Sequence, residues 1–296
     1  MNKSIHTLIP DVYELLQRKD NWFTNELAEE FSKQVALRLQ DHLGIPDKSP
    51  KLRLSKMGEV CPCALWHSIH SPDEAEKLPP WAVFKLAYGH IIEALALTLA
   101  KAAGHTVEGE QDAVELDGIQ GHRDAIIDGA LVDVKSGTTF GIKRLKDRSI
   151  ASNDPFSYLV QLDGYLSASR EDHLLVLKDK AYLWGIDKTL GHMALYEHKH
   201  RDFLVRERVK KSKDIVGLAY PPACECGTEP FGKSGNIGLD TRASYSMYKH
   251  CCFPKLRTFL YADGPVYLTK VVRKPDVTEI DRYGKLVVDY GPYSFS

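Results

Sequence analysis

The sequence has almost no net charge, since 39 lysines and arginines face 40 aspartates and glutamates, which gives −1 at pH 7. It also lacks a long uncharged apolar run, an internal repeat, and a basic, apolar leader. These absences exclude binding of nucleic acid through overall charge, predict no membrane partner, and favour a cytoplasmic location. With 296 residues, 43% of them hydrophobic, the chain can bury a substantial core.

The six cysteines include no CxxC pair. They form three close pairs instead: Cys61 with Cys63, Cys224 with Cys226, and Cys251 with Cys252. In a cytoplasmic chain, such pairs favour metal ligation over disulfides. CxC is a poorer match than CxxC to common zinc sites, so two interpretations stay open: a Zn²⁺ site built from the first or second pair, and buried cysteines without a metal.

What the sequence does contain is a pair of carboxylates that a hairpin brings together. Two β-rich runs flank the Asp128-Gly129 dipeptide, which favours a two-residue turn. Counting back from this turn along both runs places Asp124 opposite Asp133, and the alternation of side chains adds Lys135 to the same face. Like charges that face each other repel, so the pair needs a cation such as a divalent metal, unless it lies on a solvated outer face.

A third acidic group lies on an expected helix, residues 82–104, whose side chains are apolar almost all the way round. Such a helix is normally buried in a core. His90 and Glu93 share one face of it, because they are three residues apart. An ionised glutamate is costly on a buried helix, so we expect Glu93 to point at the same cation as the two aspartates. Alternatively, Glu93 lies on a narrow solvent-exposed stripe of the helix together with Lys101.

The last element of the predicted site follows the hairpin. Asp154-Pro155 is typical of an N-cap and a first helical residue, and it opens an expected helix over residues 154–170. Gln161 and Tyr165 lie one turn apart on one face of this helix. A QxxxY pair alone is more typical of surface and core edge, but its position after the carboxylate hairpin favours a role in the site.

Elsewhere, helical patterns dominate residues 1–45, which we expect to form an N-terminal cap. Residues 173–179 and 181–187 are rich in apolar and β-branched side chains and predict two strands joined by a short turn. We expect a helix from about Lys188 to Lys211, and then an irregular segment rich in proline, glycine and cysteine.

Taken together, these residues resemble the PD-(D/E)XK nucleases, and most closely the RecB-like branch that includes phage-encoded exonucleases. The motifs follow the family's order: GxxxE ending at Glu93, GHxD ending at Asp124, DxK with Asp133 and Lys135, and QxxxY with Gln161 and Tyr165. Each motif alone is short and common. Four of them in one order, spacing and expected secondary structure are specific, and the resemblance covers roughly residues 54–273.

The resemblance implies a site in which Mg²⁺ or Mn²⁺ is held by Glu93, Asp124, Asp133 and the carbonyl of Val134. Lys135 would position and help to deprotonate the attacking water, or stabilise the phosphorane-like charge. Gln161 and Tyr165 would orient the DNA strand and the lysine. Many relatives have a histidine in place of Glu93, so His90 is a further candidate ligand.

A basic run in the expected loop between the last two motifs would neutralise DNA phosphates and make binding salt-dependent. It consists of Lys143, Arg144, Lys146 and Arg148. A second basic stretch covers residues 198–213. Either run alone is more typical of a solvated face, but the first adjoins the predicted metal site.

Relatives often bind a 4Fe-4S cluster through one cysteine before the nuclease core and three after it. Aligning residues 246–253 with the family's C-terminal cysteines places Ser246 and Ala243 where two thiolates are expected. Only Cys61 and Cys252 then keep matching positions. Serine and alanine cannot replace thiolates without weakening a cluster, so we expect no cluster here.

The sequence thus predicts an α/β protein whose PD-(D/E)XK core has a mixed central sheet flanked by helices. We expect a helical cap at residues 1–55, the nuclease core at 56–215, and a cysteine-containing extension packed on the core at 216–296. The expected function is metal-dependent hydrolysis of DNA, as an exonuclease in phage or bacterial recombination, repair or replication. DNA and a recombination or annealing protein are the expected partners. The alternative is a non-catalytic nucleic-acid-binding protein with a structural metal site on the same fold.

Overall fold

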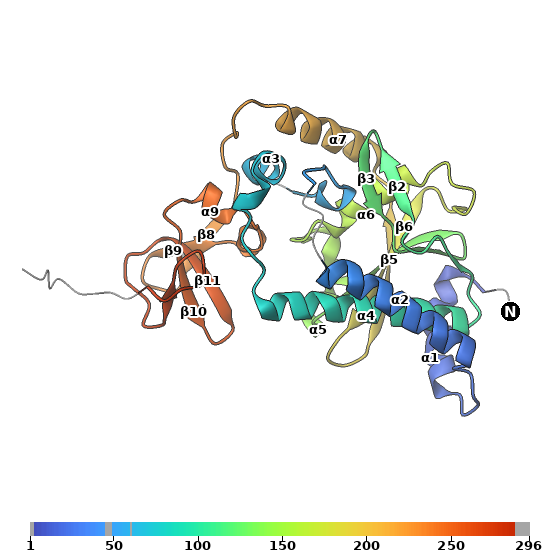
Figure 1. The fold of residues 1–296 in the computed structure, drawn as a ribbon. Coiled ribbons are helices and arrows are strands. Elements are labelled where there is room, and N and C mark those ends of the chain that lie inside the picture. The colour runs from blue at the N-terminus through green and yellow to red at the C-terminus, as the bar shows by residue number, and fades with distance from the viewer. Residues whose placement is uncertain (1–2, 45–48, 60, 288–296) are drawn as a thin grey trace, which may run out of the picture. The chain divides into compact units, whose positions relative to one another are not determined.

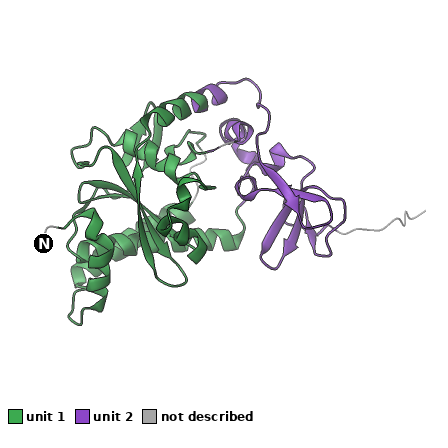
Figure 2. Cartoon of the chain, turned by 180° about the vertical axis from the view of Figure 1, so that it is seen from behind, with its two compact units in different colours: residues 1–58, 78–211 green, residues 59–77, 212–296 purple. Residues whose placement is uncertain are grey.

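The computed structural model describes residues 3–44, 49–59 and 61–287. Helices and strands are interspersed along the chain, as in an α/β protein (Figure 1). They form two compact units: residues 1–58 with 78–211, and residues 59–77 with 212–296 (Figure 2). The helices of the predicted cap therefore pack within the first unit. The domain boundaries expected after residues 55 and 215 stay predictions.

A five-stranded sheet is the centre of the first unit. Its strand order is β1-β4-β5-β6-β7, with a parallel β5–β6 pair and three antiparallel pairs. The strands span Val107–Glu108 (β1), Ala125–Ile127 (β4), Ala130–Gly137 (β5), Lys180–Asp187 (β6) and Met193–Lys199 (β7). The predicted fold class, an α/β core with a mixed central sheet flanked by helices, is confirmed.

Helices cover both faces of this sheet. They span Leu8–Gln17 (α1), Asn25–Leu43 (α2), Pro80–Ala102 (α4), Thr139–Lys146 (α5), Tyr158–Ala168 (α6) and Asp202–Val216 (α7), whose last residues belong to the second unit. Helices α1 and α4 pack on the face that presents Val132 and Val134. Successive side chains of a strand point to opposite sides, so Leu131 lies on the other face from Val132. Helices α5 and α6 pack on this opposite face.

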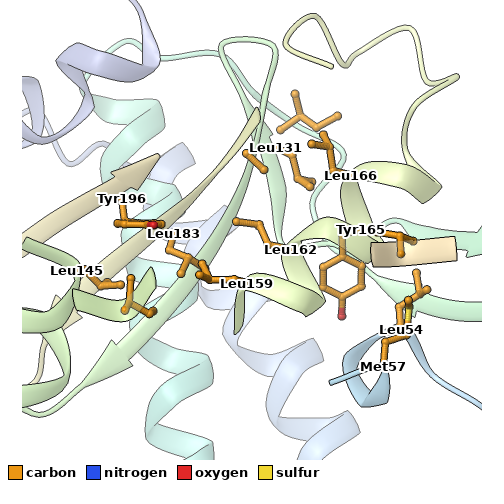
Figure 3. Packing of buried hydrophobic residues seen from close by; sticks show 14 of the residues in the cluster. Leu54, Met57, Leu131, Leu145, Leu159, Leu162, Tyr165, Leu166, Leu183 and Tyr196 are labelled. Carbon is orange, nitrogen blue, oxygen red and sulfur yellow. The ribbon is translucent and has the colours of Figure 1, made fainter. Parts of the chain in front are cut away.

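The α6 face carries a continuous apolar core. Leu159 and Leu162 of α6 lie against Leu131 of β5 and Leu183 of β6 (Figure 3). Burying a side chain of this size stabilises the fold by about 1.5–3 kcal/mol. The core thereby fixes α6, and with it the QxxxY pair, against the strand that carries Asp133.

Helix α4 is the described helix that is long and apolar enough to cross a membrane by length and composition. Its C-terminal half instead lies in the core of the first unit, where Ala96, Leu97 and Ala100 contact the sheet and α1. Core helices of soluble proteins have the same composition, and the observed packing agrees with the helix predicted over residues 82–104.

The β4–β5 hairpin has the predicted register, since Ile127 pairs with Ala130. Asp128 and Gly129 between them have φ of 49° and 76°. A type I′ turn needs positive φ at both central positions, which is why this dipeptide occurs there.

The β-rich run that precedes the Asp128-Gly129 turn, residues 119–127, does not form one strand but is divided at Arg123. β3 (Ile119–His122) pairs with β2 (Ala113–Leu116) in a separate two-stranded sheet, and β4 begins only at Ala125. The guanidinium of Arg123 is buried and forms ion pairs with Asp112 and Asp172 at 2.8 and 2.6 Å. A buried charge needs such partners, and they hold this residue between the two ladders.

Four other segments differ from their predictions. Residues 173–179 contain no strand, and residues 188–211 contain β7 followed by the start of α7 in place of one helix. Every second residue of β7 is buried, which is the period of a strand. The basic run expected in a loop lies largely on α5. The helix expected to begin at Asp154 and Pro155 begins only at Tyr158, and Ser157 occupies its N-cap position. The Asp154 carboxylate still accepts the backbone N–H groups of Tyr158 and Leu159 in the first turn.

Asp163→Ala is expected to lower the free energy of unfolding by about 3–5 kcal/mol. The carboxylate of Asp163 in α6 is fully buried, lies 2.8 Å from His198 Nε2, and accepts the backbone N–H and Nε–H of Arg201 at 3.0 and 2.8 Å. Burial would raise the pKa of Asp163, but the hydrogen bonds and charges of His198 and Arg201 outweigh burial and lower it.

The stabilisation by Asp163 is therefore present above the carboxyl pKa of the unfolded chain and is lost as the pH falls through the lowered pKa. Urea unfolding at pH 7 and at about pH 2.5, below the unfolded carboxyl pKa of about 3.9, measures it. Asp214→Ala on the exposed side of α7 is the control and should change stability by less than about 0.5 kcal/mol. Equal stability of the two variants at pH 7 would contradict the prediction.

The second unit contains a five-stranded antiparallel sheet of order β12-β10-β11-β9-β8. The strands span Thr228–Phe231 (β8), Asn236–Leu239 (β9), Arg257–Tyr261 (β10), Gly264–Lys270 (β11) and Glu279–Ile280 (β12). The helices span Pro62–His70 (α3), Thr241–Ser244 (α8) and Lys249–Cys252 (α9). The cysteines cluster around Ala64 and Tyr248, which brings α3 and α9 together.

Candidate active site

The charged residues of the predicted site come from three elements of the first unit. Glu93 lies in α4, Asp124 directly precedes β4, and Asp133 and Lys135 lie in β5. Asp124 Oδ2 accepts the backbone N–H of Val134 at 2.7 Å, so the hairpin brings Asp124 to the strand that carries Asp133. Asp133 is 2% exposed and Glu93 is 9% exposed, so both carboxylates are withdrawn from water.

Two side chains from outside the sequence motifs hold Glu93. Gln111 Nε2 donates to Glu93 Oε1 at 2.7 Å and also reaches Asp124 Oδ1 at 3.5 Å. Arg38 of α2 forms an ion pair with the same Glu93 oxygen at 3.3 Å. Gln111 has φ of 57°, in the left-handed region that residues other than glycine rarely adopt. Such strain is concentrated at functional sites, in agreement with the position of Gln111 between two acidic side chains.

Lys135 provides a second cation. Its Nζ lies 2.7 Å from Asp133 Oδ2 and 5.3 Å from the centre of the Tyr158 ring. Burial by itself would lower the pKa of Lys135, but the charges of Asp133 and Asp124 outweigh burial and raise the pKa. The side chain is therefore a protonated ammonium at neutral pH.

The carboxylates resist ionisation together. Burial, followed by the charge of Glu93, raises the pKa of Asp124 to about 7. Burial raises the pKa of Asp133 to about 7 as well, against the opposing effect of Lys135. Burial also raises the pKa of Glu93. A further cation among these groups would stabilise their ionised forms.

The donor set fits a hard divalent ion, because Mg²⁺ and Mn²⁺ prefer carboxylate oxygens. Apart from the ion pair with Lys135, both carboxylate oxygens of Asp133 are buried and accept no hydrogen bond in the described structure. Among the described residues, the oxygens of Glu93, Asp124 and Asp133 do not all lie within 4.8 Å of one another. Binding of one ion by all three carboxylates would therefore require their oxygens to move closer together.

Tyr165 of the QxxxY pair belongs to the apolar core of the first unit. Gln161 Nε2 donates to the hydroxyl of Tyr165 at 3.1 Å. The Tyr165 ring is buried and packs near Leu54 and Met57 (Figure 3). A Cβ atom at Gly121 would lie 2.8 Å from this ring, so the glycine of the GHxD motif provides the space for it. Burial raises the pKa of Tyr165 to about 12, so the hydroxyl keeps its proton at neutral pH.

His90 lies at the edge of the acidic group. Its Nδ1 is 4.0 Å from Glu93 Oε2, and its ring centre is 5.1 Å from that of His42 on α2. Burial lowers the pKa of His90, and the charges of His42 and Arg38 lower it further. A neutral imidazole, the form that binds metals, is therefore favoured.

The basic residues predicted to contact DNA divide into two groups. Lys143 and Lys146 are exposed on α5, whose buried side chains face the sheet. Arg144 donates to the backbone carbonyl of Asn153, and Arg148 lies 5.1 Å from the centre of the Tyr196 ring. The two lysines are thus exposed to solvent, while the two arginines also contact the protein.

Sequence reasoning missed Arg38, Gln111 and Tyr158. The spacing of Tyr158 from Gln161 and Tyr165 is helical, and this was the available signal for it. Arg38 and Gln111 come from segments without a motif, and only the tertiary structure brings them to Glu93.

A second group of candidate ligands lies in the second unit. The thiols of Cys61, Cys224, Cys226 and Cys252 all lie within 4.8 Å of one another. Cys61 Sγ is 3.8 Å from Cys224 Sγ and 3.6 Å from Cys252 Sγ. Hydrogen bonds from Cys226 and Cys252 lower the pKa of Cys61, which favours the thiolate that metals bind. The backbone N–H of Cys226 donates to Cys224 Sγ at 3.4 Å.

This group differs from the alignment made on sequence, in which Cys61 and Cys252 alone kept ligand positions. The CEC segment, Cys224 with Cys226, provides the two thiols that the alignment would have placed at Ala243 and Ser246. Ala243 is instead buried in an apolar cluster with Leu239 and Leu256. Contrary to that expectation, four thiols are close enough to bind one metal centre.

The structure is similar to several solved structures, two of which are exonucleases. An alkaline exonuclease from Laribacter hongkongensis, LHK-Exo, matches with a TM-score of 0.40 and 12% identity, over 64% of this chain and 91% of that chain. A phage-related exonuclease from Haemophilus somnus 129PT matches with a TM-score of 0.38 and 16% identity, over 56% and 93% of the two chains. SSO0001 matches with a TM-score of 0.37 and 15% identity, over 78% and 97%. No protein-family model and no curated protein matches the sequence.

Proposed function

We propose that this protein is a metal-dependent DNA nuclease, and more specifically an exonuclease that hydrolyses phosphodiester bonds. The observation that carries the proposal is the pair of Asp124, which is half-buried, and Asp133, which is buried, beside the ammonium of Lys135. Acidic oxygens next to a fixed cation suit a divalent ion that meets a phosphate.

In this proposal, Mg²⁺ or Mn²⁺ is held by Glu93, Asp124, Asp133 and the carbonyl of Val134, with His90 as a further candidate. When bound, the ion lowers the pKa of a water molecule and neutralises charge on the phosphate. Glu93 presents Oε2 to the site, because Oε1 is occupied by donors from the protein. Asp124 is held through Oδ2 by the Val134 N–H and leaves Oδ1 with a single long hydrogen bond.

Lys135 stabilises the negative charge that develops on the phosphate oxygens. Its raised pKa keeps it protonated, so we assign it charge stabilisation and orientation of the water in preference to proton removal. Asp133 holds its Nζ, and the Tyr158 ring covers it. Gln161 and Tyr165 position the lysine and the DNA strand from α6. Lys143 and Lys146, with Arg144 and Arg148 beside them, would neutralise backbone phosphates.

We infer a biological role in phage or bacterial recombination, repair or replication, in the cytoplasm of a bacterial or phage-infected cell. A recombination or annealing protein is the proposed protein partner. These proposals come from the resemblance of the four motifs to those of the RecB-like branch.

A comparison of end-labelled linear DNA with closed circular DNA tests the nuclease proposal. We expect the wild-type protein to degrade the linear DNA with Mg²⁺ or Mn²⁺ and to leave the circle intact, because an exonuclease requires an end. Chelation by EDTA should stop the reaction. Cleavage of the circle would indicate an endonuclease, and binding of DNA without cleavage in either metal would favour the non-catalytic alternative.

We also propose that the four-thiol group binds one Zn²⁺ ion that supports the second unit. A tetrahedral zinc with Zn–S bonds of about 2.3 Å places its sulfur atoms about 3.8 Å apart. The Sγ–Sγ distances of 3.8 and 3.6 Å agree with this spacing. In a 4Fe-4S cluster each thiolate binds a different iron atom, which requires the thiolates to lie farther apart.

A further inference from the structure

Arg38 is a charged side chain of the site for which the proposed mechanism has no use. It lies on α2 and is 7% exposed, and it is the buried residue of that helix. Its Nε and Nη2 donate to Glu93 Oε1 at 3.4 and 3.3 Å, and its Nη1 donates to Gln34 Oε1. A surface helix usually buries apolar side chains, so a buried guanidinium at this position needs a physical reason.

The two carboxylate oxygens of Glu93 differ in their hydrogen-bond partners. Oε1 receives the donors of both Arg38 and Gln111. Oε2 has His90 Nδ1 as its neighbour at 4.0 Å, which is longer than a hydrogen bond. Hydrogen-bond partners commonly orient the side chains that bind a metal. Here the donors hold Oε1 of Glu93 and leave Oε2 free to face a metal ion.

Arg38 belongs to a polar stripe on α2 that faces α4. Gln34, Arg38 and His42 are spaced by four residues and therefore share one side of the helix. Gln34 supports the guanidinium, while His42 lies beside His90 and 3.0 Å from the backbone carbonyl of Val83. The neighbouring side chains of this stripe fix the guanidinium of Arg38 next to Glu93.

The charges of the site indicate what Arg38 does there. When Glu93, Asp124 and Asp133 are ionised, their three negative charges face the two positive charges of Lys135 and Arg38. One divalent ion leaves a net charge of +1, which a DNA phosphodiester neutralises. Two divalent ions would leave +3 with Arg38 present and +2 without it, so the charge of Arg38 disfavours a second ion.

We propose that Arg38 is a positioning residue that takes the place of a second divalent cation, so that the carboxylate site holds one Mg²⁺ or Mn²⁺ ion. This inference rests on the proposed function. It predicts that the charge of Arg38, and not merely its contact with Glu93, sets the number of bound ions.

Titration of the full chain with Mn²⁺, followed by electron paramagnetic resonance and calorimetry, tests the proposal. The wild type should bind one Mn²⁺ ion at the carboxylates, and Glu93→Gln should weaken this binding. Arg38→Gln keeps a hydrogen-bond donor and removes the charge. It should bind two Mn²⁺ ions, the first about tenfold more tightly than the wild type does, because a repelling charge is gone. Arg38→Lys keeps the charge and should bind one ion with an affinity close to that of the wild type.

A single Mn²⁺ ion in Arg38→Gln, with unchanged or weaker affinity, would overturn this inference and leave the proposed function intact. Loss of Mn²⁺ binding in both Arg38 variants would show a purely structural contact and would overturn it as well. If the wild type binds no Mn²⁺ at the carboxylates, the proposed function itself fails. Should Arg38→Gln not fold, two ions bound to Arg38→Lys would still refute the proposal.

Discussion

Lys135→Ala is expected to reduce the rate of DNA hydrolysis by roughly 10³-fold, the scale of losing one preorganised charge from an active site. The ammonium of Lys135 is fixed by Asp133 and remains protonated, so it supplies charge stabilisation without reorganisation. The variant removes that charge and also leaves Asp133 without its ion pair. DNA affinity should change little, because the exposed lysines of α5 carry most of the phosphate contacts in the proposed complex.

Single-turnover cleavage of end-labelled linear DNA with Mg²⁺ measures the rate, and a filter-binding assay with Ca²⁺ in place of Mg²⁺ measures affinity. Lys178→Ala removes an exposed lysine away from the site and is the matched control. Equal digestion by Lys135→Ala and the wild type would show that the activity resides in another site. Intact binding with lost cleavage would separate an enzyme from a mere DNA-binding protein.

Cys61→Ser is expected to release the metal from the second unit and to unfold that unit. Metal binding at structural zinc sites contributes about 10–16 kcal/mol of apparent free energy, which small units use for folding. Cys61 lies within 4 Å of two other thiols, so its loss breaks the group of four. Elemental analysis should find about one zinc per wild-type chain and far less in the variant.

Cys251→Ser is the matched control, because Cys251 adjoins Cys252 in sequence but lies outside the group of four thiols. It should keep both the zinc and the thermal unfolding transition of the wild type. An absorption spectrum of anaerobically purified protein provides the decisive comparison. A brown band with about four irons per chain would replace the zinc proposal with a 4Fe-4S cluster. No metal in the wild type would leave the thiols as buried, unligated cysteines.

Local physics made part of this fold predictable. The Asp128-Gly129 turn fixes its own register, because both positions need positive φ, and that register alone places Asp124 across from Asp133. The Asp154 carboxylate binds backbone N–H groups in the first turn of α6, although the helix itself begins only at Tyr158. In each case the interaction joins residues that are close in sequence, so it can be predicted from the sequence.

Interactions between distant segments could not be predicted in the same way. The division between β3 and β4 at Arg123 depends on ion pairs with Asp112 and Asp172. No periodic pattern in the sequence predicts these pairs. Arg38 reaches Glu93 from 55 residues away, and its helix has an ordinary amphipathic sequence. The cysteine alignment failed for the same reason, since the spacing along the chain does not determine which thiols meet.

The second unit is assembled from two stretches of chain that enclose residues 78–211, and this arrangement imposes an order on synthesis. Cys61 leaves the ribosome 163 residues before Cys224 does. Domains generally fold as units while the chain grows, so the first unit can complete its sheet in the meantime. Residues 59–77 must then stay reduced and unaggregated until the C-terminal strands emerge. Oxidising stress during translation should therefore damage nascent chains more than finished ones.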